Sequence, residues 1–399
     1  MSGPVRVNNA DLLAPPVVQT IQQRSLVVGV IFAVLSIIGL LIRPGEFFPA
    51  YLLGFMAWLG VTLGCLAILM LQHMTGGAWG LVIRRILEAG TRTLPLMALL
   101  FIPLLFGMPK LYIWAHASEV AKDKHLQELT HAYLNFSGFL GRAVFYFVIW
   151  GVLAYFLNRW SEEQDNAALP DNSFRLRALS GPGLVLYALC MSFAAIDWVM
   201  SLSPHWISTI YPLIFLVGQV LSALGFVVAV ETILSRYKPM SELLKPDHAH
   251  DHGKLILTFV MLWAYFSFSQ WLIIWAGNLP QEISWFVTRL SGGWGFVGLF
   301  LAAFHFAVPF VLLLSRQLKR NLRTLMWLAV WLMFMRVVDL FWMIEPTFHE
   351  QLHVTVWDIV VPVAIGGCWL TLFFRNLKGR PLLPLYDPHS REILEPPHD

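Results

Sequence analysis

Apolar runs of about 20 residues recur along this chain, and they constrain its fold more than any other feature. The hydrocarbon core of a bilayer is about 30 Å thick, a distance that an α-helix of roughly 20 residues spans. This core contains no water, so each run must satisfy its own backbone hydrogen bonds, as a helix does. We therefore predict an all-α, polytopic membrane protein of about ten transmembrane helices. The predicted spans are residues 25–42, 48–71, 78–107, 138–157, 180–202, 207–234, 255–277, 294–314, 324–345 and 354–374.

The composition supports this fold class. Of the 399 residues, 57% are hydrophobic and only 13% are charged, whereas soluble proteins carry about 25% charged residues. The net charge of +3 gives no indication of nucleic-acid binding, and the partner that the composition implies is lipid. We divide the chain into an N-terminal arm (1–24), a transmembrane domain (25–375) and a C-terminal tail (376–399). No small-residue cleavage signal follows the first run, which we interpret as a retained helix.

The distribution of basic residues predicts the orientation. Of the 27 Lys and Arg residues, 17 fall on the side of the two termini, 5 fall on the other side, and 5 lie in or at the edges of spans. Short cytoplasmic loops are enriched in Lys and Arg, so both termini are predicted to be cytoplasmic. The longest outer loop, 108–137, combines apolar residues with three histidines, and we interpret it as a docking surface.

Charged side chains toward the outer face are the first candidate functional residues. An ionised group costs about 2.5–3.5 kcal/mol at the centre of a membrane helix, so it persists there only with a partner or a use. Asp197 lies near the outer end of the fifth span, and no cation lies near it in the sequence. His205 follows in a short outer turn. We favour a functional role for both residues.

Four further polar residues lie in the later spans. Arg336 and Asp339 are three residues apart, a spacing that predicts mutual neutralisation. His305 lies near the middle of the eighth span, where a satisfied core histidine is the default interpretation. Gln270 lies in the seventh span. These side chains converge with Asp197 only if their helices are neighbours.

The third span carries a set of charges in its inner half: Arg84, Arg85, Glu88 and Arg92. Spacings of three, four and seven residues place a carboxylate between guanidinium groups on one helix face. A structural ion-pair cluster and a proton path are equally consistent with this pattern. Glu231, near the inner end of the sixth span, either faces the same region or is a solvated charge at a helix end.

These residues fit two kinds of chemistry. A proton pathway needs titratable groups toward each face, and a quinol site needs a His or carboxylate beside apolar walls. The chain has no CxxC or CxxCH motif, which argues against an iron–sulfur cluster or c-type haem. Only one histidine is well inside a span, which argues against b-type haem. We interpret the alternating His248, His250 and His252 as a solvated loop and not as a metal site.

Several ordered segments resemble one family, the ActF subunits of alternative complex III, a quinol:electron acceptor oxidoreductase. The most distinctive is Ser192-Phe-Ala-Ala-Ile-Asp197-Trp-Val-Met-Ser-Leu-Ser-Pro-His205-Trp206. The others, in order along the chain, are Gly76-Gly-Ala-Trp79 with Arg84, Arg85 and Glu88, then Trp263 to Glu282, His305-Phe-Ala-Val-Pro309, and Arg336-Val-Val-Asp339. The resemblance covers about residues 45–375, and the number of spans agrees with it.

The resemblance implies an NrfD-like, polysulfide reductase-type membrane subunit built on four-helix bundles in the bacterial inner membrane. Its expected partners are an ActC-like membrane subunit, periplasmic subunits that hold haem c and iron–sulfur clusters, and a terminal oxidase. The chain itself would bind no metal or haem, with quinone as a candidate ligand. Proton half-channels are the expected role, with Asp197, His205, Gln270, His305, Arg336 and Asp339 in the outer half and Arg84, Arg85, Glu88 and Arg92 in the inner half.

The sequence departs from the family pattern at Ser203 and Gln281, where the family is commonly acidic. Both positions are predicted at the outer surface, so they bear on partners and proton exit more than on the fold. Two other functions stay open. One is a quinone-binding NrfD-like anchor of another respiratory oxidoreductase, and the other is a stand-alone secondary transporter, which would have broken helices in matching halves.

Overall fold

The computed structural model describes residues 13–165, 171–384 and 387. These residues form helices and connections without a strand, and ten helical segments are long and apolar enough to cross a membrane. The predicted all-α, polytopic fold is therefore confirmed. The ten segments are Pro16–Ile42, Pro44–Thr75, Arg84–Leu111, Phe136–Glu163, Ser173–Leu202, Tyr211–Leu234, Pro246–Gly277, Trp294–Leu314, Leu322–Thr347 and Trp357–Lys378.

The individual helices follow in chain order. They are α1 (Pro16–Ile42), α2 (Pro44–Thr75), α3 (Ala78–Leu81), α4 (Arg84–Thr91), α5 (Leu94–Leu111), α6 (Ala117–Val120), α7 (Lys124–Ala132), α8 (Phe136–Glu163), α9 (Ser173–Trp198), α10 (Tyr211–Leu234), α11 (Met240–Leu243), α12 (Pro246–Gly277), α13 (Pro280–Leu290), α14 (Trp294–Leu301), α15 (Val308–Leu314), α16 (Arg316–Arg320), α17 (Leu322–Ile344) and α18 (Trp357–Lys378). Short 3-10 turns cover Ile113–Ala115, Met200–Leu202 and Glu345–Thr347, and a π-helical turn covers Ala302–Ala307.

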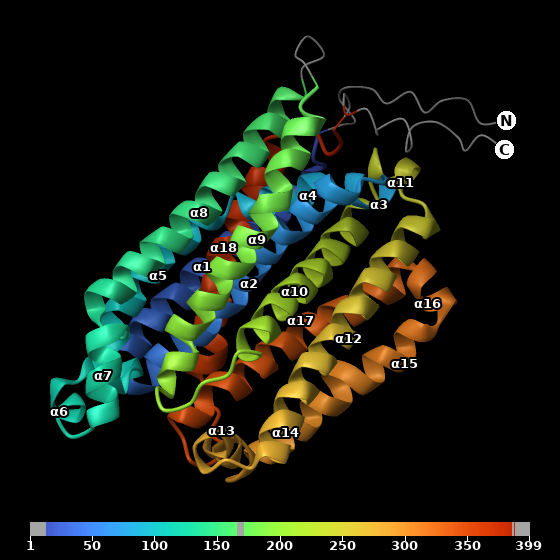
Figure 1. Ribbon diagram of the computed structural model, residues 1–399. Helices are drawn as coiled ribbons and strands as arrows, with labels where there is room; N and C mark the ends of the chain where they lie inside the picture. Colours follow the sequence, from blue (N-terminus) through green and yellow to red (C-terminus); the bar gives the residue numbers. More distant parts are fainter. Residues whose placement is uncertain (1–12, 166–170, 385–386, 388–399) are drawn as a thin grey trace.

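Eight of the ten long segments form two bundles of four, and α1 and α18 form an outer pair. Helix α2 packs against α4, α5 and α9, and α8 packs against α5 and α9, which makes the first bundle. Helix α10 packs against α12 and α17, and α14 and α15 complete the second bundle. The two bundles meet where α2 and α9 contact α10 (Figure 1). Accordingly α2 and α10 are buried on nearly all sides, as expected of helices that are hydrophobic all round.

Glycine permits the closest contact between the bundles. A Cβ added at Gly64 on α2 would lie 2.1 Å from the carbonyl oxygen of Gln219 on α10. The outer pair α1 and α18 uses the same device, because Gly29 and Gly367 face each other with backbone in contact. Small residues let helix backbones approach within a membrane, where packing replaces the hydrophobic effect as the force between helices.

The remaining surface matches a lipid environment. Large apolar side chains are at least half exposed on two of the helices. They include Leu26, Val30 and Val34 on α1, and Leu99 and Phe106 on α5. Side chains of this type cannot face water over such an area without causing association, so they indicate contact with lipid.

We name the two ends of the molecule by the chain. The terminal end is where α1 begins and α18 ends, with α3 and α11 nearby, and the distal end carries α6, α7 and α13 (Figure 1). The first helix begins at Pro16 and not near residue 25, because a proline is favourable in the first helical turn. The predicted arm and tail otherwise lie mostly outside the described residues.

Two predicted spans are interrupted. The third is divided into α3, α4 and α5, with Pro95 in the first turn of α5 where it starts a helix and does not kink one. The eighth contains the π-helical turn between α14 and α15, and Pro309 follows it. Pro212 likewise lies in the first turn of α10, whereas Pro103 and Pro362 are inside helices.

Candidate functional sites

Glu88 is the centre of a polar network at the terminal end of the first bundle. Its side chain is fully buried on α4. Arg85 Nη1 donates to Oε2 at 2.7 Å, and Arg84 Nε donates to Oε1 at 3.2 Å. Ser161 Oγ, from the end of α8, donates to Oε1 at 2.5 Å. The spacing of these residues on one helix face therefore gives the predicted cluster.

This network also holds the segment after α18. Arg84 Nη1 lies 2.5 Å from Asp387 Oδ2. Arg380 Nη1 lies 3.5 Å from Glu88 Oε2, and its Nη2 lies 2.5 Å from Glu162 Oε2. Loss of one partner of a buried ion pair leaves an uncompensated charge. The cluster thus ties the C-terminal segment to α4 and α8, in addition to any role in proton transfer.

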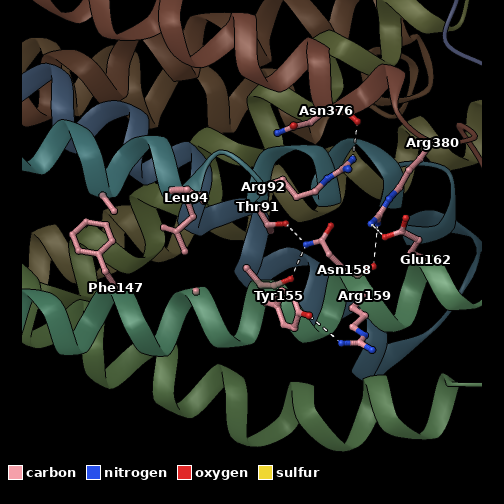
Figure 2. A pocket seen from close by; sticks show the side chains of 14 residues that line it. Thr91, Arg92, Leu94, Phe147, Tyr155, Asn158, Arg159, Glu162, Asn376 and Arg380 are labelled. Carbon is pink, nitrogen blue, oxygen red and sulfur yellow. Dashed lines mark hydrogen bonds and ion pairs between the residues drawn. The ribbon is translucent and has the colours of Figure 1, made fainter.

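Arg92 does not join this cluster, contrary to its predicted place on the same helix face. Its backbone N–H still bonds to the carbonyl oxygen of Glu88 at 3.2 Å, so Arg92 keeps its place at the end of α4 while its side chain reaches away from Glu88. Arg92 Nη2 instead donates to the carbonyl oxygen of Asn376 on α18, at 2.7 Å. The side chain lines a cavity of about 680 Å³ between α5, α8 and the segment after α18 (Figure 2).

Asp197 has a cation partner that sequence spacing did not reveal. The residue is fully buried near the distal end of α9. Arg142 on α8 donates from Nη2 to Oδ1 at 2.9 Å and from Nε to Oδ2 at 2.9 Å. Tyr146 donates its hydroxyl hydrogen to Oδ2 at 2.8 Å. The guanidinium of Arg142 also lies 3.7 Å from the ring centroid of Tyr133, a cation–π contact that holds it in place.

His205 lies apart from this buried pair. Its side chain is 56% exposed, and Nε2 lies 3.1 Å from Asp123 Oδ2, just before α7. Its ring is also close to that of His125. The predicted docking loop thus contains α6 and α7, and His205 contributes to its surface.

Arg336 and Asp339 form the predicted ion pair within α17. Arg336 Nη1 donates to Asp339 Oδ2, and Trp263 Nε1 on α12 donates to the same oxygen at 3.1 Å. Gly218 on α10 makes room for the guanidinium, since a Cβ there would lie 2.3 Å from Arg336 Cζ. Three helices of the second bundle therefore converge on this pair.

His305 and Gln270 belong to the same region. The ring of His305 is fully buried in the π-helical turn and stacks on Trp263, with the centroids 4.2 Å apart. A π-helical turn in an α-helix often marks a functional position. Gln270 and Asp339 both line a cavity of about 870 Å³ that is walled mainly by apolar residues, several of them aromatic. His305, Gln270, Arg336 and Asp339 thus come together, whereas Asp197 and His205 are held elsewhere.

Glu231 and His252 form a second buried pair at the terminal end. His252 Nδ1 on α12 lies 2.9 Å from Glu231 Oε2 on α10, and both side chains are fully buried. His252 Nε2 also lies 2.8 Å from the carbonyl oxygen of Trp79. The interpretation of the histidine tract as a solvated loop was wrong. Pro246 starts α12 before the tract, so helical spacing turns His248 and His252 inward.

Uncharged polar side chains also pair in the interior, both between the bundles at α9 and α10 and among α2, the start of α5 and α18. The hydroxyl of Tyr187 on α9 donates to Gln219 Oε1 on α10 at 2.8 Å. Thr62 on α2 and Thr93 join their hydroxyl groups at 2.9 Å, and Trp369 Nε1 donates to Thr62 at 2.8 Å. None of these residues is charged, so the sequence pattern did not indicate their pairing.

The residues missed by sequence reasoning have one signal in common. Arg142 and His252 are titratable or charged, and each lies within a few residues of the predicted edge of a span. Antiparallel neighbours such as α8 and α9 bring the start of one helix beside the end of the next. A charge near the start of one span can therefore pair with a charge near the end of its antiparallel neighbour.

Comparisons with known proteins add no assignment to this geometry. No protein-family model matches the chain, and no curated protein matches it at a significant level.

Proposed function

We propose that this chain is a membrane subunit of a quinol-oxidising respiratory complex of the alternative complex III type, and that it provides half-channels for protons. One observation carries the proposal. Each bundle holds a buried carboxylate near each end: Glu88 and Asp197 in the first, and Glu231 and Asp339 in the second, where Glu345 is also buried just after α17. Acidic residues are expensive at such positions, and in membrane proteins they mark proton or ion pathways.

The partners of these carboxylates suit proton transfer. Glu88 accepts a hydrogen bond from Ser161, Asp197 from Tyr146, and Glu231 lies against His252. Hydroxyl and imidazole groups both accept and donate protons, so each can pass a proton to or from the adjacent carboxylate. The hydroxyl and amide pairs between the bundles, such as Tyr187 with Gln219, lie where two half-channels would approach each other.

The proposed setting is the bacterial inner membrane, with both termini in the cytoplasm, as the distribution of Lys and Arg favours. The terminal end then takes up protons, and the distal end faces the periplasmic partners that hold haem c and iron–sulfur clusters. The exposed helices α6 and α7, with His125 and His205, offer them a surface.

The test is the assembled complex in lipid vesicles, with variants Glu88→Gln and Asp197→Asn. We expect both to lower proton release per quinol oxidised. The control is Glu128→Gln, at an exposed position on α7. If both variants assemble to the wild-type level and release protons as the wild type does, the half-channel proposal is refuted.

A second candidate function is quinone binding by this chain, favoured by the cavity of about 870 Å³. Its walls include Trp271, Trp285 and Phe286, which suit a flat ring, and Gln270 is 3% exposed with Oε1 lacking a hydrogen-bond partner. Ligand sites commonly combine apolar walls with a few such polar groups. A photoreactive quinone should label α12 or α17, and Gln270→Leu should reduce the labelling.

Purification separates both functions from a stand-alone transporter. A respiratory subunit should be isolated together with proteins that contain haem c and iron–sulfur clusters, which show characteristic absorption and paramagnetic resonance spectra. Isolation of the chain without them, in a state that moves a solute, would favour a transporter instead.

A further inference from the structure

We propose that the cavity of about 680 Å³ between α5 and α8 binds the phosphoglycerol head group of an anionic phospholipid from the surrounding membrane. This inference does not depend on the proposed respiratory function. The cavity lies at the terminal end, beside the break between α4 and α5 (Figure 2). Basic pockets between transmembrane helices on the cytoplasmic side commonly bind anionic head groups.

The charges around the cavity favour an anion. Three arginines and one glutamate line it: Arg92, Arg159, Arg380 and Glu162. Arg380 is already paired with Glu162, with Nη2 2.5 Å from Oε2. Arg92 has no ion-pair partner within the described part of the chain, and its side chain makes one hydrogen bond there, to the backbone carbonyl of Asn376. A guanidinium at the edge of a membrane is stabilised by an anion, and its planar donors match phosphate oxygens.

Two buried polar atoms at the cavity lack partners. The Oδ1 atom of Asn158 and the Nε atom of Arg92 are buried without a hydrogen bond in the described structure. Asn158 is 6% exposed, and its Nδ2 is already used by Thr91 Oγ1 at 2.8 Å. Figure 2 shows the Asn158 carboxamide near the side chains of Arg92 and Arg380. Buried polar atoms in folded proteins are nearly always hydrogen-bonded, so these two indicate a missing ligand.

The two atoms specify complementary groups on that ligand. Arg92 Nε is a donor and needs an oxygen such as that of a phosphate, whereas Asn158 Oδ1 is an acceptor and needs a hydroxyl or amine hydrogen. A phosphoglycerol head group supplies both, with one negative charge. Choline supplies no such hydrogen, so a zwitterionic choline lipid would leave Asn158 unsatisfied.

The rest of the cavity suits acyl chains. Leu94, Pro95, Ala98 and Phe147 contribute apolar wall. Beyond them, Leu99 and Phe106 on α5 and Val148 on α8 are exposed toward the lipid. A ligand with a charged head and apolar tails therefore fits both parts, whereas free phosphate would fill only the polar part.

Space for the ligand exists at Gly151. This residue lines the cavity, and a Cβ added there would meet nothing within 4 Å. Gly151→Leu should therefore fill the cavity without a clash and without changing any charge. Gly141, on the same helix, has equally free space near the distal end, which makes Gly141→Leu a matched control.

The experiment is lipid titration of the full chain in detergent, or of the complex if the chain is isolated as one, followed by native mass spectrometry. The lipids are phosphatidylglycerol and phosphatidylcholine with identical acyl chains, and a separate arm adds inorganic phosphate as a competitor. We expect the wild type to prefer phosphatidylglycerol. Arg92→Gln should weaken that binding by about fivefold, the usual effect of one basic residue near an anionic lipid.

The controls decide between site binding and general attraction to the surface. Arg24→Gln removes an exposed arginine from the terminal end of α1, and we expect it to retain wild-type binding. Gly151→Leu should abolish the preference, and Gly141→Leu should keep it. The proposal is overturned if Arg92→Gln and Gly151→Leu both bind phosphatidylglycerol as tightly as wild type. It is also overturned if inorganic phosphate alone displaces the lipid at equal concentration.

Discussion

His252 and Glu231 meet in the interior of the second bundle, with Nδ1 of the histidine 2.9 Å from Oε2 of the glutamate. The imidazole is held on its other side by the carbonyl oxygen of Trp79, at 2.8 Å from Nε2. A carboxylate, an imidazole and a backbone carbonyl thus form a row across α10, α12 and α3. This row belongs to the terminal end, as does Glu88 in the first bundle.

Removing one member of this pair should destabilise the fold strongly. We expect His252→Leu to lower the free energy of unfolding by about 3–5 kcal/mol, because it leaves a buried carboxylate without a partner. The double variant His252→Leu with Glu231→Leu should recover most of the loss, because apolar residues often replace a buried ion pair without cost. Unfolding in mixed detergent micelles measures both. Equal losses in the single and double variants would show that the pair is not coupled.

Arg142 should not be replaceable by lysine. Its guanidinium donates to both carboxylate oxygens of Asp197 and lies over the ring of Tyr133. A lysine ammonium group is a point charge and cannot make the two hydrogen bonds and the ring contact at once. We expect Arg142→Lys to cost roughly 1–2 kcal/mol of stability, from a lost charged hydrogen bond and a weaker cation–π contact. The matched control is Arg159→Lys on the same helix, where the pair with Glu163 is exposed to solvent and the substitution should leave stability nearly unchanged.

The contact between α2 and α10 should be disrupted by alanine at Gly64 but should tolerate alanine at Gly60. Gly64→Ala places a Cβ 2.1 Å from the Gln219 carbonyl oxygen, so α2 and α10 must separate. We expect Gly64→Ala to lower the free energy of unfolding by about 1–3 kcal/mol, as at other overpacked positions. Gly60→Ala, one turn earlier, places its Cβ 3.4 Å from Gln219 Cγ and should be nearly neutral. Thermal inactivation in detergent compares the two, and similar midpoints would contradict this packing.

His349, in the distal connection before α18, should make stability depend on pH. Burial and the neighbouring His353 lower the pKa of His349 below its ordinary value of 6.5. As the pH falls below this value, the unfolded chain takes up a proton that the folded chain binds less readily, so stability decreases. Above pH 6.5 the histidine is neutral in both the folded and the unfolded chain, so this loss of stability is absent.

The measurement is the unfolding midpoint of wild type and His349→Gln between about pH 7 and pH 5. The variant should lose less stability over this range. His131→Gln, at an exposed position on α7, serves as the control and should keep the wild-type dependence. A variant His349→Gln whose pH dependence equals that of the wild type would exclude this histidine as the cause.

Ion pairs within one helix followed from the sequence, whereas pairs between helices did not. Glu88 with Arg84 and Arg85, and Arg336 with Asp339, have spacings of three or four residues, which fix their proximity on any helix. Asp197 with Arg142 joins two helices, so the sequence showed a lone carboxylate. The correct prediction there required knowing that α8 and α9 are antiparallel neighbours.

Side-chain reach and helix boundaries set a second limit. Arg92 was expected beside Arg85 in the cluster around Glu88, yet its side chain donates to the carbonyl oxygen of Asn376 and lines the cavity of about 680 Å³. The histidine tract was expected in solvent, yet a helix that starts at Pro246 buried His252. For the tract, a helix boundary a few residues earlier than expected turned a side chain from solvent into the interior.

The sequence by itself determined that this is an all-helical membrane protein with ten spans, because side-chain hydropathy depends on local composition alone and unpaired backbone groups in hydrocarbon force each apolar run into a helix. It also determined that charged residues such as Glu88, Asp197 and Asp339 lie within the spans. Only the tertiary structure decided which of them meet. Contacts such as Glu231 with His252 depend on which helices are neighbours and at what depth, and close packing of small residues such as Gly64 decides that across distant parts of the chain.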